Sequence, residues 1–519
     1  MPEPRTWQFV AGSAVLGLAL AAGAVTAAGP WDSGQRKAER ARAVHADGRG
    51  GAHHAGAPAA APHRPAPAPS AAGVLRALGI PEAAPTRGTT GTGDSTRTGD
   101  ASGLAPVPDL AAVLVPLLGD PGLGTLRTAS VVDAATGRQL YGEGAATPMT
   151  PASTVKLATT TAALSALGPE HRIATTTVAA PDGRTVTLVG GGDPTLDRAR
   201  LTALAGDTAR ALKARGTGTA TAPVRLTYDT SLYKGPERHP IGPNENLAPV
   251  TALMTDEGRT GGDGTGPAPR TADPAGDTAT AFAGLLRKAG VKLQGDPAPG
   301  KAPEAPKAAG TGQKAAGTAG QKAAPLARTD SAPLADLVER TLTSSDNDLA
   351  EALARQTALA RHQPASFAGA GKAVHDELAR LGLPLAGARF ADGSGLDRTD
   401  RVSAALLTGL LTRAADPHRP ALRPVLTGLP VSGFTGTLAG RFGTGPAASG
   451  AGLVRAKTGT LTGVNTLAGT VVTPDGRLLA FAFLAGGTSS PDAAQTALDR
   501  LSAALASAAA PKRPQDPPH

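Results

Sequence analysis

The amino-acid sequence predicts an α+β fold, in which helices flank an antiparallel sheet and a large β-rich insert splits the domain. Residues 128–141 have a strand–turn–strand pattern, and residues 452–484 contain three more strands separated by turn residues. Apolar residues at helical spacing border both groups. The composition changes at residues 173–328, where strand-like segments are frequent, and this change indicates the insert.

The composition limits the classes of function. The 519 residues are enough for more than one domain, but 67 glycines, 46 prolines and only 3% aromatics leave much of the chain outside a packed core. The absence of cysteine excludes disulfides, thiolate metal sites and cysteine nucleophiles. The net charge of +9 favours an anionic surface, such as lipid headgroups or acidic wall polymers, as a partner. No nucleic-acid-binding motif is present, so nucleic acid is not an expected partner.

Both ends of the chain are predicted to lie outside the folded body. Residues 7–28 carry no charge and are numerous enough to span a bilayer, so residues 1–31 are interpreted as a signal peptide or a membrane anchor. Residues 32–105 are rich in Ala, Pro and Gly and predict a disordered tether, and residues 511–519 predict a disordered tail. The body of the protein would then lie outside the cytoplasm, either secreted or anchored to the membrane.

The first part of the main domain covers residues 106–172. It begins with an apolar stripe at helical spacing that Pro116 interrupts, so a short helix is expected. A hairpin follows, with Ala135-Thr-Gly137 as its turn. A helix is predicted over residues 154–167, where Gly and Pro are absent, and Gly168-Pro169 is a stop signal.

The insert, residues 173–328, is predicted to contain strands at 185–189 and 224–228 and one good helix at 278–288. Gly190-Gly-Gly-Asp-Pro194 predicts a loop; a phosphate cradle is a weak alternative because no Gly-Lys-Ser/Thr follows. Residues 301–324 contain a near-repeat of Ala, Gly, Gln and Lys and are interpreted as a flexible insertion.

The second part of the main domain, residues 329–510, resumes the helical pattern. The predicted helices and strands follow one another in the order helix 334–342, helix 349–361, helix 404–413, strand 452–460, strand 465–473 and strand 478–484. A tight loop is expected at Asp392-Gly-Ser-Gly395. A final helix is expected to begin at Ser490-Pro491, which suits an N-cap followed by proline at the first helical position.

The pair Ser153 and Lys156 is the centre of the functional prediction. Three residues apart on a helix, the two side chains share one face, and a lysine there can take the proton of a serine nucleophile. A second copy of Ser-x-x-Lys at Ser231 and Lys234 is followed at once by Gly235-Pro236, so no helix is expected and the copy is interpreted as a loop coincidence. A helix N-cap serine and a solvated lysine are the ordinary alternatives for the first pair.

Two further motifs strengthen the first. Ser345-Asp-Asn347 and Lys457-Thr-Gly-Thr460 follow in the order and spacing that resemble the three-part signature of penicillin-recognising serine enzymes. Ser345 would relay the proton to the leaving amine, and Asn347 would bind the substrate backbone and Lys156; a capping pair is the alternative. Lys457 and Thr458 would hold a substrate carboxylate, and the N–H groups of Ser153 and Thr460 would form an oxyanion hole.

A glycine within a strand, such as Gly459, indicates that another group approaches the backbone closely. An extended substrate peptide that pairs with the strand would be such a group. An ordinary edge strand is the alternative. Lys156 must be neutral to accept a proton. We expect the positive charge of Lys457 to favour that neutral form.

Residues 106–509 resemble the low-molecular-mass class C penicillin-binding proteins, which include DacB-like serine peptidases. Beyond the three motifs, the resemblance is carried by Met149-Thr-Pro-Ala-Ser153, Gly190-Gly-Gly-Asp-Pro194, Ala252-Leu-Met-Thr-Asp-Glu257, Asp392-Gly-Ser-Gly-Leu396 and Gly436-Thr-Leu438. It implies a transpeptidase/β-lactamase-like domain split by a large insert. It also implies a D-alanyl-D-alanine carboxypeptidase/endopeptidase of the bacterial cell envelope that acts on peptidoglycan stem peptides through an acyl-enzyme on Ser153 and binds β-lactam antibiotics.

Two alternative functions stay open. A serine β-lactamase shares the three motifs, but the extra Glu-x-x-x-Asn loop of the class A enzymes is not found after Ser345. A non-catalytic cell-wall-binding protein is disfavoured because the motif residues are intact. A zinc peptidase is disfavoured since no His-Glu-x-x-His is present, and we expect neither a metal nor a cofactor.

Overall fold

The computed structural model describes residues 109–261, 264–303 and 324–508, all within one compact unit of the chain, 100–519. The predicted leader, tether and C-terminal tail, and residues 304–323 of the predicted insertion, lie outside the described residues. Ala324 already belongs to a strand, so the predicted insertion extends one residue too far. Of the helices in the described ranges, none is long and apolar enough to cross a membrane.

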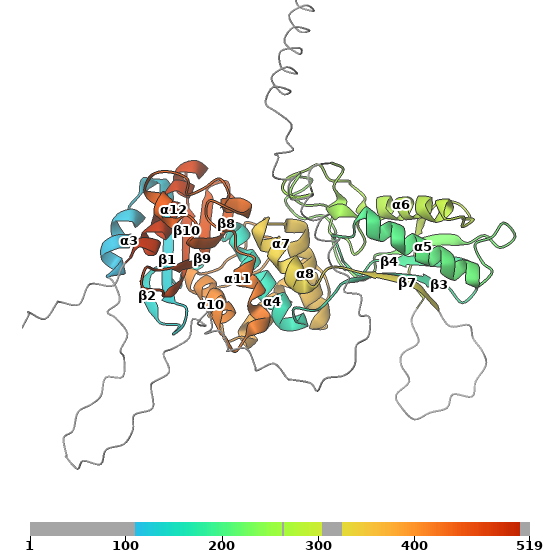
Figure 1. The fold of residues 1–519 in the computed structure, drawn as a ribbon, viewed down its shortest axis with the longest axis horizontal. Coiled ribbons are helices and arrows are strands. Elements are labelled where there is room, and N and C mark those ends of the chain that lie inside the picture. Colours follow the sequence, from blue (N-terminus) through green and yellow to red (C-terminus); the bar gives the residue numbers. More distant parts are fainter. Residues whose placement is uncertain (1–108, 262–263, 304–323, 509–519) are drawn as a thin grey trace, which may run out of the picture. The chain divides into compact units, whose positions relative to one another are not determined.

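The main sheet joins the two ends of the described chain (Figure 1). It has the order β2-β1-β10-β9-β8, and each strand is antiparallel to its neighbours. The strands are β1 (Leu126–Asp133), β2 (Gln139–Glu143), β8 (Val454–Leu461), β9 (Val464–Val472) and β10 (Leu478–Gly486). The predicted N-terminal hairpin therefore pairs with the three predicted C-terminal strands through β1 and β10. The antiparallel sheet of the predicted fold class is confirmed.

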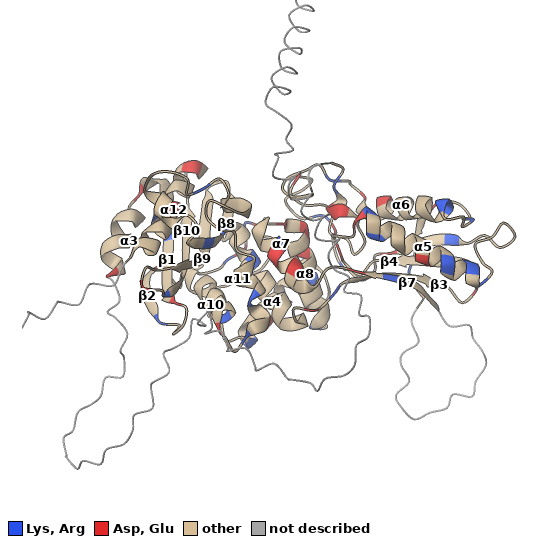
Figure 2. Cartoon of the chain, viewed as in Figure 1, with Lys and Arg blue, Asp and Glu red and all other residues tan. Residues whose placement is uncertain are grey.

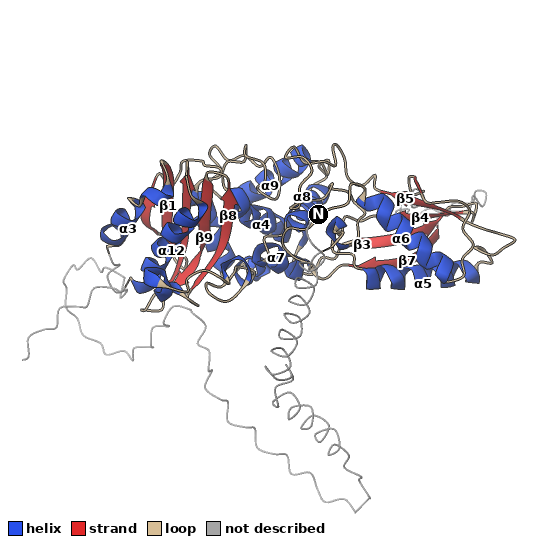
Figure 3. Ribbon diagram, turned by 90° about the horizontal axis from the view of Figure 1, so that it is seen from above, coloured by secondary structure: helices blue, strands red, loops and turns tan. Residues whose placement is uncertain are grey.

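Two helices cover one face of this sheet (Figure 3). They are α3 (Leu110–Leu118) and α12 (Pro491–Ser507), which share a core with the strands. Pro116 lies inside α3, whose buried residues are Leu110, Leu114 and Leu118, as the apolar stripe predicts. The side chain of Ser490 caps α12 by accepting the N–H of Ala493, so the predicted start of the last helix is confirmed.

The opposite face carries a larger helical layer around one core. It consists of α4 (Lys156–Leu167), α7 (Leu334–Thr343), α8 (Asn347–Ala360), α9 (Phe367–Arg380), α10 (Ala404–Ala415) and the short α11 (Pro424–Thr427). Nine successive residues of α4, from Lys156 to Leu164, are buried, so this helix is surrounded by protein. Helix α9 was not predicted from the sequence; Val374 and Leu378 are the two large apolar residues on its buried face, beside Ala370, Gly371, Ala373 and Glu377.

The insert forms a second five-stranded sheet with its own core, in the order β6-β5-β4-β3-β7. Its strands are β3 (Ala174–Ala179), β4 (Thr185–Val189), β5 (Arg225–Asp229), β6 (Ala298–Pro299) and β7 (Ala324–Asp330). The neighbours β4–β5 and β5–β6 are parallel, and the other two pairs are antiparallel. Two helices, α5 (Arg198–Ala214) and α6 (Pro274–Lys288), accompany the sheet, where the sequence analysis predicted only the second (Figure 1).

Short 3₁₀ turns connect several of these elements. They lie at Pro121–Leu123, Ala152–Val155, Asp256–Gly258, Pro420–Leu422, Gly436–Leu438 and Gly445–Gly450. The loop of three glycines at 190–192 packs against α8 of the same chain. The carbonyl of Gly191 accepts a hydrogen bond from Gln356 Nε2 on this helix (2.7 Å). A Cβ on Gly191 would lie 1.8 Å from the carbonyl oxygen of Ala174. The loop is therefore a close packing contact, and the phosphate-cradle alternative has no support.

Candidate active site

Ser153 lies in the 3₁₀ turn that leads into α4. The sequence predicted an α-helix from residue 154, whereas the α-helical geometry begins at Lys156. Ala152, immediately before Ser153, has a φ of 49°, which is unusual for a residue with a side chain. Backbone strain of this kind is held in place by the surrounding structure and is concentrated at functional sites. The turn thus fixes the half-buried Ser153 at the entrance to a buried helix.

The Lys156 side chain is fully buried and makes three short contacts. Its Nζ lies 2.9 Å from Ser153 Oγ, 2.7 Å from Asn347 Oδ1 and 2.5 Å from the backbone oxygen of Ser394. The last two atoms are acceptors only, so they take the two N–H bonds of a neutral amine. The remaining lone pair then points to Ser153, whose hydroxyl can donate to it. The geometry suits a lysine that accepts the serine proton.

Burial is the main cause that lowers the pKa of Lys156, to about 8, while nearby carboxylates oppose it. The sequence-based hypothesis gave this role to the charge of Lys457, and the structure assigns it to burial instead. Lys457 is also fully buried. Its pKa is lowered well below the usual value by burial first and by the charge of Lys156 second. The repulsion between the two lysines therefore acts on Lys457.

The Ser345 motif lies at the junction of α7 and α8, as predicted. Ser345 is half-buried and has a φ of 58°, so this loop also contains a strained residue. Asp346 is the N-cap of α8, and its Oδ1 accepts the N–H of Leu349 (3.0 Å). Asn347 is therefore not needed as a cap: its Oδ1 faces Lys156, and its Nδ2 donates to the carbonyl of Asn246 in the insert (2.9 Å).

The Lys457 motif lies on β8, at the edge of the main sheet. Lys457 Nζ donates to the carbonyl of Thr458 (2.8 Å), and Thr458 Oγ1 donates to Thr437 Oγ1 (2.9 Å). A Cβ on Gly459 would lie 2.7 Å from the carbonyl oxygen of Pro151 and 3.1 Å from the N atom of Ser153. The glycine is thus required because the turn of Ser153 packs on β8, a contact that has no signal in the sequence.

The direction of the main-chain groups of β8 supports the predicted oxyanion hole. The N–H of Ala456 donates to the carbonyl of Pro430 on the side away from β9 (3.0 Å). Main-chain groups alternate in direction along an antiparallel strand, so the N–H of Thr460, four residues later, points to the same side. The N atom of Ser153 approaches β8 at Gly459, one residue before Thr460.

A tight loop at 392–395 holds the carbonyl that faces Lys156. Its N–H groups are bound by carboxylates: Glu351 Oε1 accepts from Gly393 (2.9 Å) and Ser394 (3.0 Å), and Asp392 Oδ1 accepts from Gly395 (2.6 Å). The resemblance pointed to this loop without giving it a role. The sequence spacing alone gives no sign that Ser394 contacts Lys156.

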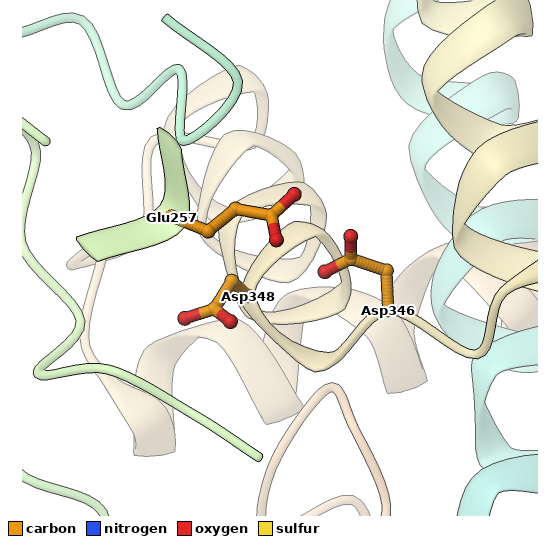
Figure 4. A group of neighbouring side chains, drawn as sticks. All are labelled: Glu257, Asp346 and Asp348. Atoms are coloured by element: carbon orange, nitrogen blue, oxygen red, sulfur yellow. The ribbon is translucent and has the colours of Figure 1, made fainter. Parts of the chain in front are cut away.

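Three buried carboxylates meet behind the loop of Ser345 (Figure 4). Oxygens of Glu257, Asp346 and Asp348 lie within 4.8 Å of one another, and acidic residues mark α7 and α8 in Figure 2. Burial, and then the charge of Asp346, raises the pKa of Glu257 to about 8. The same two causes raise the pKa of Asp348 to about 6. Burial and the charge of Asp346 therefore both oppose ionisation of Glu257 and Asp348.

Arginines balance the charge of this cluster. The carboxylates form ion pairs with three guanidinium groups, those of Arg259, Arg270 and Arg340. Arg270 Nη2 lies 3.1 Å from Asp348 Oδ2, and Arg259 Nε lies 2.9 Å from Glu257 Oε2. Because the counter-charge is supplied by the protein, we assign no metal to this cluster. Its structural effect is to bind the insert to α7 and α8 directly behind Ser345.

Comparison with known proteins places these features in a family. The model of the D-Ala-D-Ala carboxypeptidase 3 (S13) family matches residues 110–280 and 263–507. The carboxypeptidase DacB of Mycolicibacterium smegmatis is 36% identical over 422 residues, which cover 78% of this chain and 85% of that protein. A carboxypeptidase of Mycobacterium tuberculosis is 35% identical over 409 residues, with coverage of 74% and 83%.

A solved structure agrees with the fold. Penicillin binding protein 4 (dacB) of Haemophilus influenzae has a TM-score of 0.59 and 22% identity, covering 74% of this chain and 97% of that one. The predicted penicillin-binding-protein fold is confirmed by this likeness. The family model matches more than half of the sequence, and the relatives are matched over most of their own length. The chain belongs to the D-Ala-D-Ala carboxypeptidase 3 (S13) family.

Proposed function

We propose that this protein is a serine-type D-alanyl-D-alanine carboxypeptidase/endopeptidase that acts on peptidoglycan stem peptides and is inhibited by penicillin. The observation that carries the proposal is the contact between a buried lysine and a serine, with Lys156 Nζ 2.9 Å from Ser153 Oγ. The two named relatives described above are carboxypeptidases, which supports the same class of reaction.

In the proposed reaction, Lys156 takes the proton of Ser153 as Oγ attacks the carbonyl carbon of the penultimate D-alanine. The N–H groups of Ser153 and Thr460 stabilise the oxyanion. As the peptide bond breaks, Ser345 passes its proton to the amine of the leaving D-alanine and receives the proton held by Lys156, so that both groups return to their starting forms. Water hydrolyses the resulting ester, which releases the shortened peptide and restores the serine hydroxyl.

Lys457 and Thr458 bind the terminal carboxylate of the substrate in this proposal. The pKa of Lys457 is held low by burial, and a carboxylate placed beside the amine would raise it again. Substrate binding and protonation of Lys457 are therefore coupled. A substrate with a free carboxylate supplies the charge that stabilises the protonated lysine.

The β-lactamase alternative requires a carboxylate that can activate water for rapid deacylation. Glu351, on α8 shortly after Asn347, does not suit this role, because its oxygens bind two backbone N–H groups and Arg355 Nη1 (2.9 Å). The side chain is also fully buried. A slow release of the penicilloyl group is therefore expected. The contacts between Ser153, Lys156 and Asn347 likewise argue against a non-catalytic wall-binding protein.

We propose that the protein acts outside the cytoplasm, in the bacterial cell envelope, where its proposed substrate lies. We propose that residues 1–31 deliver it there and either anchor it or are removed. The net charge of +9 would favour contact with the anionic membrane or wall surface. Fractionation of cells producing the full chain, with and without a high-salt wash, separates an anchored protein from one held by charge.

The function is tested by labelling the full chain with fluorescent penicillin and mapping the modified residue. The proposal expects a stable adduct on Ser153 and release of D-alanine from a peptide ending in D-alanyl-D-alanine. Rapid loss of the label would identify a β-lactamase instead. The absence of both label and D-alanine release would favour a wall-binding protein.

A further inference from the structure

His239 is a buried residue of the insert that contacts the loop supporting Lys156. It is 6% exposed, and its Nε2 lies 2.9 Å from Oδ2 of Asp392, a residue 153 positions later in the chain. The ring of Phe367 contacts the imidazole edge-on, with centroids 5.3 Å apart. The imidazole is thus fixed from two sides and is not used in the reaction proposed above.

The hydrogen bonds of His239 define its tautomer. The backbone N–H of Ile241 donates to Nδ1 (3.1 Å), so Nδ1 carries no proton while this bond exists. Nε2 of the neutral ring must then carry the proton and donate it to Asp392. Burial lowers the pKa of His239, and the hydrogen bond and charge of Asp392 more than offset this, so the pKa is raised.

Asp392 connects His239 to the carbonyl at Lys156. Its Oδ1 accepts the N–H groups of Ser394 (3.1 Å) and Gly395 (2.6 Å), and its Oδ2 accepts Ser394 Oγ (3.1 Å). These bonds fix the backbone of Ser394, whose carbonyl oxygen is 2.5 Å from Lys156 Nζ. A displacement of Asp392 would therefore change the position of an acceptor that orients Lys156.

We propose that His239 is a positioning residue for the acylation step. His239 belongs to the insert and donates a hydrogen bond to Asp392, which fixes the Ser394 carbonyl. The insert thereby helps to orient the Lys156 amine toward Ser153. This inference rests on the proposed function. It assigns to the insert a role in the chemistry in addition to any role in binding the peptide.

The proposal has a defined effect on the pH dependence of acylation. The carboxylates of Asp392, Asp346, Glu351 and Asp400 raise the pKa of Lys156, and Asp392, Glu351 and Asp397 act in the same direction on His239. Loss of the His239 donor leaves the charge of Asp392 less compensated. The added negative charge favours the protonated form of Lys156, so the acid limb of the acylation rate should move to higher pH.

Two substitutions of similar size separate the two hydrogen bonds of His239. A glutamine amide can reach the position of Nε2 and donate to Asp392, whereas an asparagine can accept the N–H of Ile241 but does not reach Asp392. The rate of acylation by fluorescent penicillin is measured against pH for the full chain carrying His239→Gln or His239→Asn. His375→Ala, at a half-exposed histidine on α9, is the control.

In His239→Gln and His375→Ala we expect the acid limb of the acylation rate to lie at the same pH as in the wild type. His239→Asn should shift it upward by about one unit, which is about a tenfold loss of rate at pH values below the limb. Thermal melts of each variant establish that it is folded. An unchanged limb in a folded His239→Asn variant overturns the proposal, and so does an equal shift in both variants.

The same measurements distinguish the two proposals. A wild-type chain that penicillin does not acylate contradicts the proposed function. A wild-type chain that is acylated, together with His239 variants that keep its rate and its limb, contradicts only the role of His239. If His239→Asn does not fold, His239→Met, which fills the site without a donor, takes its place: an upward shift of the acid limb supports the donor role, and a wild-type limb overturns it.

Discussion

The two copies of Ser-x-x-Lys in this chain have the same spacing and different structures. In the first copy, Lys156 is buried and its Nζ contacts Ser153 Oγ at 2.9 Å. In the second copy, Lys234 is exposed and its Nζ donates to the backbone carbonyl of Ser231, so the two side chains are not paired. The second copy lies in a loop, as the sequence analysis predicted.

The comparison shows which physical features give the motif its chemistry. Burial lowers the pKa of Lys156, and acceptors from Asn347 and Ser394 orient its amine. An exposed lysine such as Lys234 is in contact with water, which stabilises its charged form. The Ser-x-x-Lys spacing is thus necessary but not sufficient, because the burial and the acceptors come from the surrounding fold. Substitutions at matched positions of the two copies test this conclusion.

The largest expected effect is that of Ser153→Ala, which removes the nucleophile. We expect labelling by fluorescent penicillin and release of D-alanine to be lost, while Ser231→Ala leaves both unchanged. Gel fluorescence and a D-alanine assay measure the two activities, and a melting curve checks that the variants are folded. A label that persists in Ser153→Ala would disprove the assignment of the nucleophile.

The second effect concerns the lysines. Removal of a general base typically lowers a rate by about 10²–10⁴-fold, so Lys156→Ala should reduce the acylation rate within that range. The matched Lys234→Ala should acylate as the wild type does, since its amine only contacts a carbonyl of its own loop. Stopped-flow fluorescence with labelled penicillin provides the rates. Equal losses in the two variants would contradict the distinction between the copies.

A third effect tests the packing of the Ser153 turn on β8. In Gly459→Ala the added methyl group would meet the carbonyl of Pro151 and displace Ser153. A displacement of about 1 Å can lower a rate by about a hundredfold, and we expect a loss of up to this size in acylation. Gly440→Ala is the control, because a Cβ at Gly440 has no atom within 4 Å. If both variants acylate equally well, the close contact is not required.

The pH dependence gives the smallest effect, about tenfold per pH unit. The pKa of Lys156 is lowered to about 8 by burial, and the reactive form is neutral. The acylation rate of the wild type should therefore rise with pH below about 8 and level off above it, and Lys234→Ala should have the same profile. A limb near the usual lysine pKa of about 10.4 would mean that Lys156 is hydrated in solution.

Much of the main domain could be predicted because its signals are local. Alternating strands, Gly and Pro at turns, and the Ser490-Pro491 start of α12 each lie within a few residues. Helices α5 and α9 gave weaker signals. Their buried faces contain few large apolar residues, three leucines in α5 and Val374 and Leu378 in α9, with small or polar residues at the other buried positions. Both helices therefore depend on tertiary packing.

The residues of the candidate site could be named from the sequence. The burial and contacts that give these residues their chemical properties could be found only from the fold. The three motifs identify Ser153, Lys156 and Asn347, which the structure brings into contact. The roles of Ser345 and of the carboxylate binders on β8 stay predictions. Neither the burial of Lys156 nor the contact between His239 and Asp392 has a sequence signal, because each depends on segments that are far apart in the chain.

Residues 430–432 pair with part of the outer edge of β8, and this pairing also affects the solubility of the protein. An open strand edge presents unpaired N–H and C=O groups to strands of other molecules and can start aggregation. Residues 430–432 occupy this edge beside Val454 and Ala456, so the open stretch begins only at the Lys457 motif. The open stretch of this edge is therefore short, which makes it a poor template for an intermolecular sheet.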